Sequence, residues 1–236
     1  MPLKFLELAI AAPEVLESYQ YYQRLGFTPA TTADVWSHRY AVLSDGRAAL
    51  ALHQLEFSSP AVRFVQPDLR AHVADLERLG IALESVHLDD EHFNEANFRD
   101  PDGHLVTVLE ARTFSSPEPQ GASVCGWFEE LALPARDLAL AQQFWEQLGF
   151  VAVGSEDEPA PHLALTSDHL DIGLYEPALL AAPALCFSID DQAAVTAELT
   201  ARGITASRPP AALAPERSLL LVAPEGTRMV LTAPRA

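Results

Sequence analysis

Hydrophobic residues follow two periods along this chain, one typical of strands and one typical of helices. In residues 4–11, charged or small side chains alternate with apolar ones, which is the period of a half-buried strand. After this stretch, the apolar residues Val15 and Tyr22 recur at helical spacing, and the pattern ends at Gly26. Glycine tolerates the left-handed conformation that commonly ends a helix. The pattern up to Gly26 therefore predicts a strand followed by a helix.

The same succession of elements then continues. Two strands are predicted over residues 38–44 and 48–53, on either side of the turn Asp45-Gly46. The pattern restarts with a strand over residues 62–65, a helix that opens at Pro67 and closes at Gly80, and strands near residues 96–99 and 105–110. Each half of the chain is thus predicted to hold two βαβββ modules, and the whole chain four.

The chain is an internal tandem repeat. Leu25-Gly26-Phe27 recurs as Leu148-Gly149-Phe150, 123 positions later. Three further pairs keep this offset: Gly80 and Gly203, Pro101-x-Gly103 and Pro224-x-Gly226, and Glu7-Leu8-Ala9 and Glu130-Leu131-Ala132. Because widely spaced pairs share one offset, the two halves are copies of one unit.

A polar stretch separates the two copies. It contains Pro, Ser and Gly without apolar periodicity, which is typical of a linker. We therefore predict a first domain at residues 1–113, a linker at 114–125 and a second domain at 126–236.

Composition and charge narrow the possible partners. The chain has 236 residues, 49% of them hydrophobic, so a real core can form. It carries 33 acidic and 15 basic residues, and this charge of −18 argues against nucleic acid or an anionic membrane as a partner. No apolar window is long enough for a membrane span, and Cys125 and Cys186 form no ligand motif. These features predict a cytoplasmic protein.

Several phrases resemble the vicinal-oxygen-chelate superfamily, the glyoxalase, bleomycin-resistance and extradiol-dioxygenase group. They are the strand 6–12 with residues 21–27, the phrase 99–104, and the strand 131–137 with residues 144–150. The resemblance covers nearly the whole chain and implies an α+β fold of paired βαβββ modules whose mixed sheets form cups. It is weaker for function, because this fold hosts lyases, isomerases, dioxygenases and non-catalytic binding proteins.

Enzymes of the superfamily hold a divalent metal at the bottom of the cup, and the resemblance implies where its ligands would stand. Strand alternation places Glu7, Ala51, Ala61 and Thr107 at these positions in the first copy, and Glu130, Gly173, Ala184 and Val230 in the second. Alanine, glycine and valine side chains cannot coordinate a metal. A one-residue slip in the first copy would offer His53 or His104, still not a complete set. We therefore predict no metal and no cofactor.

The remaining cup-facing residues indicate a small-molecule site, with apolar walls and a few polar groups. The candidate ligand-binding residues are Glu7, Trp36, His38, Tyr40, His53, Arg63, Thr107, Glu130, His162, Asp171, Tyr175 and Arg228, and Cys186 shares their face.

Each candidate also has a structural alternative. Trp36 and Tyr40 can be ordinary packing residues, and His38 and His53 can be rim histidines exposed to water. The two cup glutamates can form structural ion pairs, Glu7 with Arg63 and Glu130 with Arg228.

Other chemistry finds little support. Residues 89–95 concentrate carboxylates around a histidine, a pattern more typical of a solvated acidic loop than of a cation site. The chain lacks a GxSxG elbow, a P-loop and a GxGxxG motif, so acyl transfer, nucleotide hydrolysis and Rossmann chemistry are not expected.

The leading interpretation is a metal-independent protein that binds a small-molecule drug or metabolite. The alternative is a metal-dependent lyase, isomerase or dioxygenase whose ligands lie elsewhere. A third interpretation is a scaffold whose cups are filled by its own side chains. Since the duplication can supply both partners of a cup pair, we expect a monomer or a weak homodimer.

Overall fold

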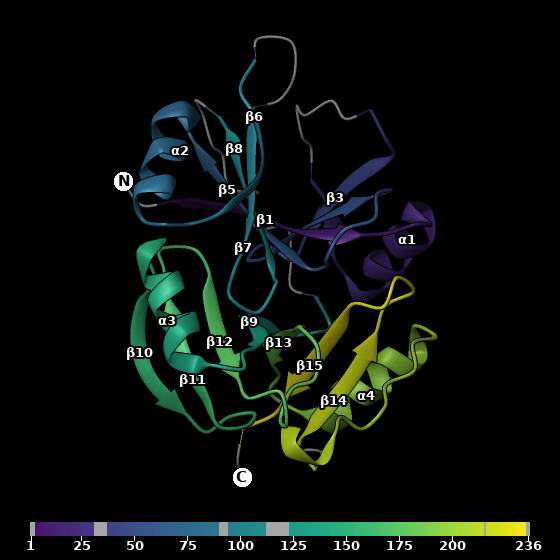
Figure 1. Ribbon diagram of the computed structural model, residues 1–236. Helices are drawn as coiled ribbons and strands as arrows, with labels where there is room; N and C mark the ends of the chain where they lie inside the picture. The colour runs from purple at the N-terminus through teal and green to yellow at the C-terminus, as the bar shows by residue number, and fades with distance from the viewer. Residues whose placement is uncertain (1–2, 31–36, 90–93, 112–122, 215, 235–236) are drawn as a thin grey trace.

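A computed structural model describes residues 3–30, 37–89, 94–111, 123–214 and 216–234. It contains two mixed sheets, one from each half of the chain (Figure 1). Trp36 and most of the predicted linker at 114–125 lie outside the described residues, as does the middle of the acidic segment 89–95.

The first half forms an eight-stranded sheet with the strand order β2-β3-β4-β1-β5-β8-β7-β6. Its elements are β1 (Lys4–Ala11), α1 (Val15–Leu25), β2 (Thr28–Pro29), β3 (Tyr40–Ser44), β4 (Ala49–His53), β5 (Ala61–Gln66), α2 (Leu69–Arg78), β6 (Leu83–His87), β7 (Glu95–Arg99) and β8 (Leu105–Glu110). The first strands of the two modules, β1 and β5, pair antiparallel at the centre.

The second half forms a seven-stranded sheet with the order β10-β11-β12-β9-β13-β15-β14. Its elements are β9 (Trp127–Pro134), α3 (Leu138–Gln147), β10 (Val151–Glu156), β11 (His162–Thr166), β12 (Asp171–Tyr175), β13 (Ala184–Ser188), α4 (Gln192–Ala201), the 3-10 turn η1 (Ala211–Leu213), β14 (Ser218–Val222) and β15 (Arg228–Thr232). The fourth module has only an isolated bridge, Ser207 with Leu220, where the second module has β6. The α+β class and the tandem cupped modules predicted from the sequence are confirmed.

Helix boundaries follow local capping chemistry. The first helix ends at Gly26, whose φ of 97° is left-handed as predicted. The second helix begins at Leu69, two residues after the predicted Pro67, because the Asp68 side chain accepts a hydrogen bond from the backbone N–H of Ala71. Asp137 and Asp191 cap α3 and α4 in the same way. None of the described helices is both long and apolar enough to span a lipid bilayer.

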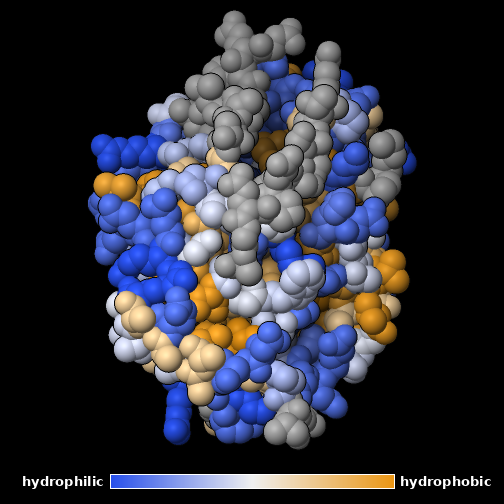
Figure 2. Space-filling model, turned by 180° about the vertical axis from the view of Figure 1, so that it is seen from behind, coloured by the Kyte–Doolittle hydropathy of each residue, from blue (hydrophilic) through white to orange (hydrophobic). Residues whose placement is uncertain are grey.

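The two halves share one hydrophobic core. Aromatic rings meet across the halves, with centroids 6.3 Å apart for Phe64 and Phe150 and 6.2 Å apart for Phe98 and Phe144. In Figure 1, α2 lies above α3 on one side of the molecule and α1 above α4 on the other. Seen from behind, the surface is largely hydrophilic, with hydrophobic side chains in separate smaller patches (Figure 2).

Equivalent turns of the two halves reach across this junction. The Glu225 carboxylate accepts hydrogen bonds from Ser18 Oγ at 2.6 Å and from Tyr22 Oη at 2.7 Å, both on α1. Asp102, which is 123 positions earlier, accepts from the backbone N–H and the guanidinium of Arg136 in the second half. The β7–β8 and β14–β15 turns therefore each form hydrogen bonds with the other half of the chain.

Candidate functional site

Strand register shows which side chains face the cups. Leu8 and Ile10 belong to the main core under the helices, whereas their neighbour Ala9 pairs with Ala51 and Ala61 on the opposite face of the sheet. In the second half, Ala132, Ala184 and Val230 belong to a separate cluster on the cup side. The predicted orientation of these strands is therefore confirmed.

The floor of the first cup is a buried chain of polar side chains. Arg63 Nη1 donates to Glu7 Oε1 at 3.2 Å and contacts His53 Nε2 at 2.6 Å, while His53 Nδ1 lies 2.8 Å from His38 Nε2. Because an arginine can only donate, His53 Nε2 accepts, and its Nδ1–H donates to His38. The predicted Glu7–Arg63 ion pair is present.

The prediction of His53 as a water-exposed rim histidine is wrong. Its side chain is fully buried, and the Tyr40 ring lies over it with centroids 4.7 Å apart. Burial lowers the pKa of His53 to about 2, and the nearby positive charge of Arg63 and the ring of His38 act in the same direction. Burial and Arg63 also lower the pKa of His38, which is partly exposed. Both rings are therefore neutral at pH 7.

Thr107 also belongs to this first cup, on the strand next to Arg63. Its hydroxyl donates to Asn97 Oδ1 at 2.6 Å rather than pointing to an open space. It lies 3% exposed.

The floor of the second cup is built around Glu130. Tyr175 Oη donates to Glu130 Oε1 at 2.6 Å, and His162 Nε2 lies 3.3 Å from Glu130 Oε2. The rings of His162 and Tyr175 stack with centroids 4.5 Å apart. The predicted Glu130–Arg228 pair is wrong, because Tyr175 from the neighbouring strand β12 and His162 from β11 reach the carboxylate instead.

His162 is arranged to carry a positive charge. Its Nδ1 lies 2.9 Å from the carbonyl oxygen of Ala160, and its Nε2 faces Glu130, so only the doubly protonated ring can donate to both acceptors. Burial lowers its pKa and is the largest single influence. The hydrogen bond and negative charge of Glu130, with smaller contributions from Ala160 and Glu156, together outweigh burial and raise the pKa.

Two further groups at this floor stay protonated. Burial raises the pKa of the Tyr175 hydroxyl, and the negative charge of Glu130 adds to the effect, so Tyr175 remains a hydrogen-bond donor. Burial and Glu130 likewise raise the pKa of the Cys186 thiol well above its usual range. Cys186 is therefore not an activated nucleophile.

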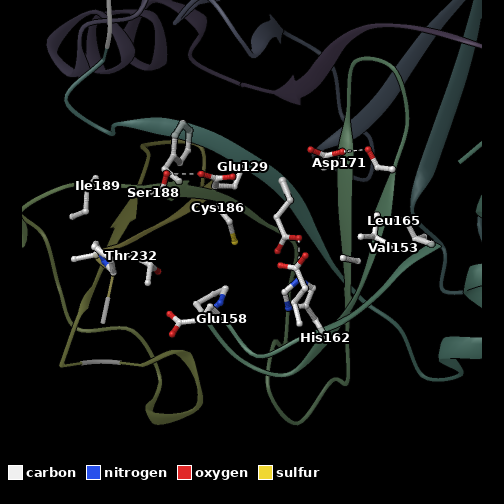
Figure 3. Close-up of a pocket in the computed structure, with 18 of the residues that line it drawn as sticks. Glu129, Val153, Glu158, His162, Leu165, Asp171, Cys186, Ser188, Ile189 and Thr232 are labelled. Carbon is white, nitrogen blue, oxygen red and sulfur yellow. Dashed lines mark hydrogen bonds and ion pairs between the residues drawn. The ribbon is translucent and has the colours of Figure 1, made fainter. Parts of the chain in front are cut away.

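A cavity of about 510 Å³ opens above this floor (Figure 3). Three predicted residues, Glu130, His162 and Asp171, line it together with Cys186. Tyr175 lies behind Glu130, and Arg228 is not among the described residues that line the cavity. The apolar part of the wall comes from Val153, Pro159, Ala164, Leu165, Phe187, Ile189, Ala233 and Pro234.

Sequence reasoning missed four acidic residues of this cavity: Glu129, Glu156, Glu158 and Asp190. Strict alternation turns Glu129 away from the cup if its neighbour Glu130 faces inward. However, β9 has a register shift here, since Cys186 pairs with Glu130 while the next residue, Phe187, pairs with Phe128. Glu129 is the extra residue of this bulge, which lets both glutamates reach the cavity. No feature of the sequence alone marks the bulge.

The donor set does not fit a catalytic metal. In the described part of the chain, no group of three or more His, Cys, Asp or Glu side chains is arranged to hold a metal ion. Gly173 stands at one implied ligand position, and a β-carbon there would overlap the carboxylate of Glu130. That carboxylate thus fills the space of the missing side chain and is already bound by Tyr175 and His162.

Comparison with known proteins identifies the class of fold. The chain has the same fold as solved extradiol dioxygenases, one of the groups that the sequence resemblance predicted. Neither a protein-family model nor a curated protein sequence matches the chain.

Three solved structures illustrate the likeness. A catechol 2,3-dioxygenase is 12% identical with a TM-score of 0.60, over 100% of this chain and 91% of its own. Homoprotocatechuate 2,3-dioxygenase from Brevibacterium fuscum (E323L mutant) is 14% identical with a TM-score of 0.65, over 99% and 72%. The enzyme from Arthrobacter globiformis is 15% identical with a TM-score of 0.64, over 99% and 80%. At these identities the likeness establishes the fold alone.

Proposed function

We propose that this chain binds a small organic molecule in the cavity of its second half and needs no metal to do so. The observation that carries the proposal is the cavity itself, whose 510 Å³ is in the range of small-molecule sites, roughly 300–1,000 Å³. Its apolar wall can bury the body of a ligand, and its polar groups can orient it.

The two cups differ in what they offer a ligand. In the first, Glu7, Arg63 and His53 bind one another and are at most 7% exposed. In the second, Glu130 and His162 are also paired, but space remains above them. We therefore assign binding to the second half and a structural role to the buried network of the first. The two covalently joined halves support a monomer or a weak homodimer.

The rival function is a metal-dependent dioxygenase. The fold comparisons favour it, because the similar solved structures are extradiol dioxygenases. The cup floor weighs against it, since alanine, glycine and valine stand where the superfamily places ligands and the remaining glutamates are engaged by the protein. We therefore derive no chemistry through a metal.

A ligand screen combined with metal analysis tests the proposal. Compounds that raise the melting temperature of the full chain should do so by mass action on the native state. Ala164→Trp fills the cavity, so it should abolish these shifts, whereas Ala74→Trp on the exposed face of α2 should preserve them. Shifts that survive Ala164→Trp would overturn the assignment of the site.

Metal content separates the two functions. Protein purified without a chelator and then titrated with divalent ions should show no stoichiometric site, and ligand shifts should be unchanged by a chelator. One tightly bound metal ion per chain, together with ring-cleaving activity on a catechol, would establish the rival function instead.

A further inference from the structure

We propose that the cavity of the second half selects organic cations: molecules with an apolar body and a positively charged group. This inference rests on the proposed function and names the class of ligand that the site takes. It comes from the apolar wall and from the balance of charges around the cavity.

The charges around the cavity are mostly negative. Six carboxylate residues line it: Glu129, Glu130, Glu156, Glu158, Asp171 and Asp190. They come from separate segments, namely β9, the end of β10 and the residues after it, the start of β12, and the second residue after β13. The negative charge of the cavity therefore comes from several elements of the second half rather than from a single loop.

Protein cations offset only part of this charge. Glu130 is paired with His162, and Glu158 accepts a hydrogen bond from Arg217 at 2.7 Å. The other contacts are to neutral groups, since Ser188 Oγ donates to Glu129 and Thr166 Oγ1 donates to Asp171 at 2.6 Å. Among the described residues, four cavity carboxylates thus lack a protein cation as partner.

This balance favours a cationic ligand. Carboxylates around an apolar, low-dielectric cavity produce a negative potential that concentrates cations and repels anions. An anion placed in the cavity would leave water without gaining a cation, since His162 already serves Glu130. A cation would find carboxylate partners at the rim while its apolar part packs against Val153, Leu165 and Phe187.

Three probes of similar shape test the inference. Benzyltrimethylammonium carries a permanent positive charge, neopentylbenzene is its neutral isostere, and phenylacetate is an anion. Equilibrium binding to the full chain should be about tenfold tighter for the cation than for the neutral isostere, and weakest for the anion. Raising the salt concentration should reduce the advantage of the cation, because its rim partners are exposed to solvent.

Two sets of variants separate the cavity from the overall charge of −18. Glu156→Gln with Asp190→Asn removes two exposed rim charges and should weaken binding of the cation about three- to tenfold while leaving the neutral isostere unchanged. Glu77→Gln on α2 of the first half changes the net charge in the same direction but should leave binding of both probes unchanged.

The outcomes distinguish this inference from the function on which it rests. Equal binding of the cation and its isostere, both abolished by Ala164→Trp, would overturn cation selectivity and keep the binding site. Preference for phenylacetate would overturn it as well. Failure of all three probes, alongside a ligand screen without any shift, would overturn the proposed function itself.

Discussion

The Glu130 carboxylate occupies the space where any residue other than glycine at position 173 would place its β-carbon. The two residues lie on neighbouring parallel strands, β9 and β12. Gly173 is therefore required by its neighbour and not by its own backbone conformation. The missing side chain and the retained glutamate form one structural unit.

Gly173→Ala should disrupt this unit. Its β-carbon would push the carboxylate away from Tyr175 and His162, and leaving buried polar groups unsatisfied costs about 1–3 kcal/mol in the free energy of unfolding. Urea denaturation measures the loss.

The double variant that combines Gly173→Ala with Glu130→Ala provides the control. Without the carboxylate, alanine at 173 meets no overlap, so the double variant should lose less stability than the sum of the two single variants. Additive losses would show that Gly173 and Glu130 are independent.

The sequence correctly predicted which face of the sheet a side chain occupies wherever the two-residue period of a strand decides it. Alternation placed Glu7, Ala51 and Glu130 on the cup face, and the structure agrees, because each lies on a regular stretch of strand where side chains two residues apart face the same side. It also predicted the Glu7–Arg63 pair, which needs only two cup-facing residues directly opposite each other on adjacent strands.

The sequence did not predict those features of the fold that depart from a regular strand. Strand β2 has only two residues and β6 has no clear alternation, so neither was located. The bulge at Glu129 changes the face of one residue without a signal in composition. The partner of Glu130 depends on the curvature that brings β11 over β9, which no local pattern encodes.

The stability that His162 contributes should fall as pH rises. Its pKa is raised in the folded protein above the ordinary 6.5. Its contribution is therefore fully present below about pH 6.5 and is lost as pH rises through the folded pKa. The difference in unfolding free energy between the wild type and His162→Gln should shrink steadily above pH 6.5.

Denaturation at several pH values measures this difference, and an NMR titration of the ring measures the pKa directly. His169→Gln, at an exposed position nearby in the sequence, serves as the matched control. A His162 pKa at or below 6.5 would contradict the charged pair.

The stability contributed by His53 should change with pH in the opposite direction. Its pKa is lowered to about 2, so the folded protein does not protonate it in the range where the unfolded chain does. Its contribution is present above about pH 6.5 and is lost as pH falls below that value, by about 1.4 kcal/mol per pH unit. Between pH 6.5 and 5, the unfolding free energy of His53→Asn should depend less on pH than that of the wild type. Parallel profiles of unfolding free energy against pH for the two proteins would refute a neutral, buried His53.

Contacts between the halves should contribute to the stability of the whole chain. Glu225→Ala removes the acceptor of both Ser18 and Tyr22 on α1, which are 1% and 0% exposed. Leaving these two buried hydroxyl donors without their acceptor should lower the unfolding free energy by about 2–3 kcal/mol. Glu216→Ala, which removes an exposed carboxylate of the same half, should change the unfolding free energy by less than about 0.5 kcal/mol.

Because both halves share one core, Glu225→Ala should shift a single cooperative transition, observed both by far-ultraviolet circular dichroism and by tryptophan fluorescence. Two separate transitions, with only the first half affected, would show instead that the halves unfold independently.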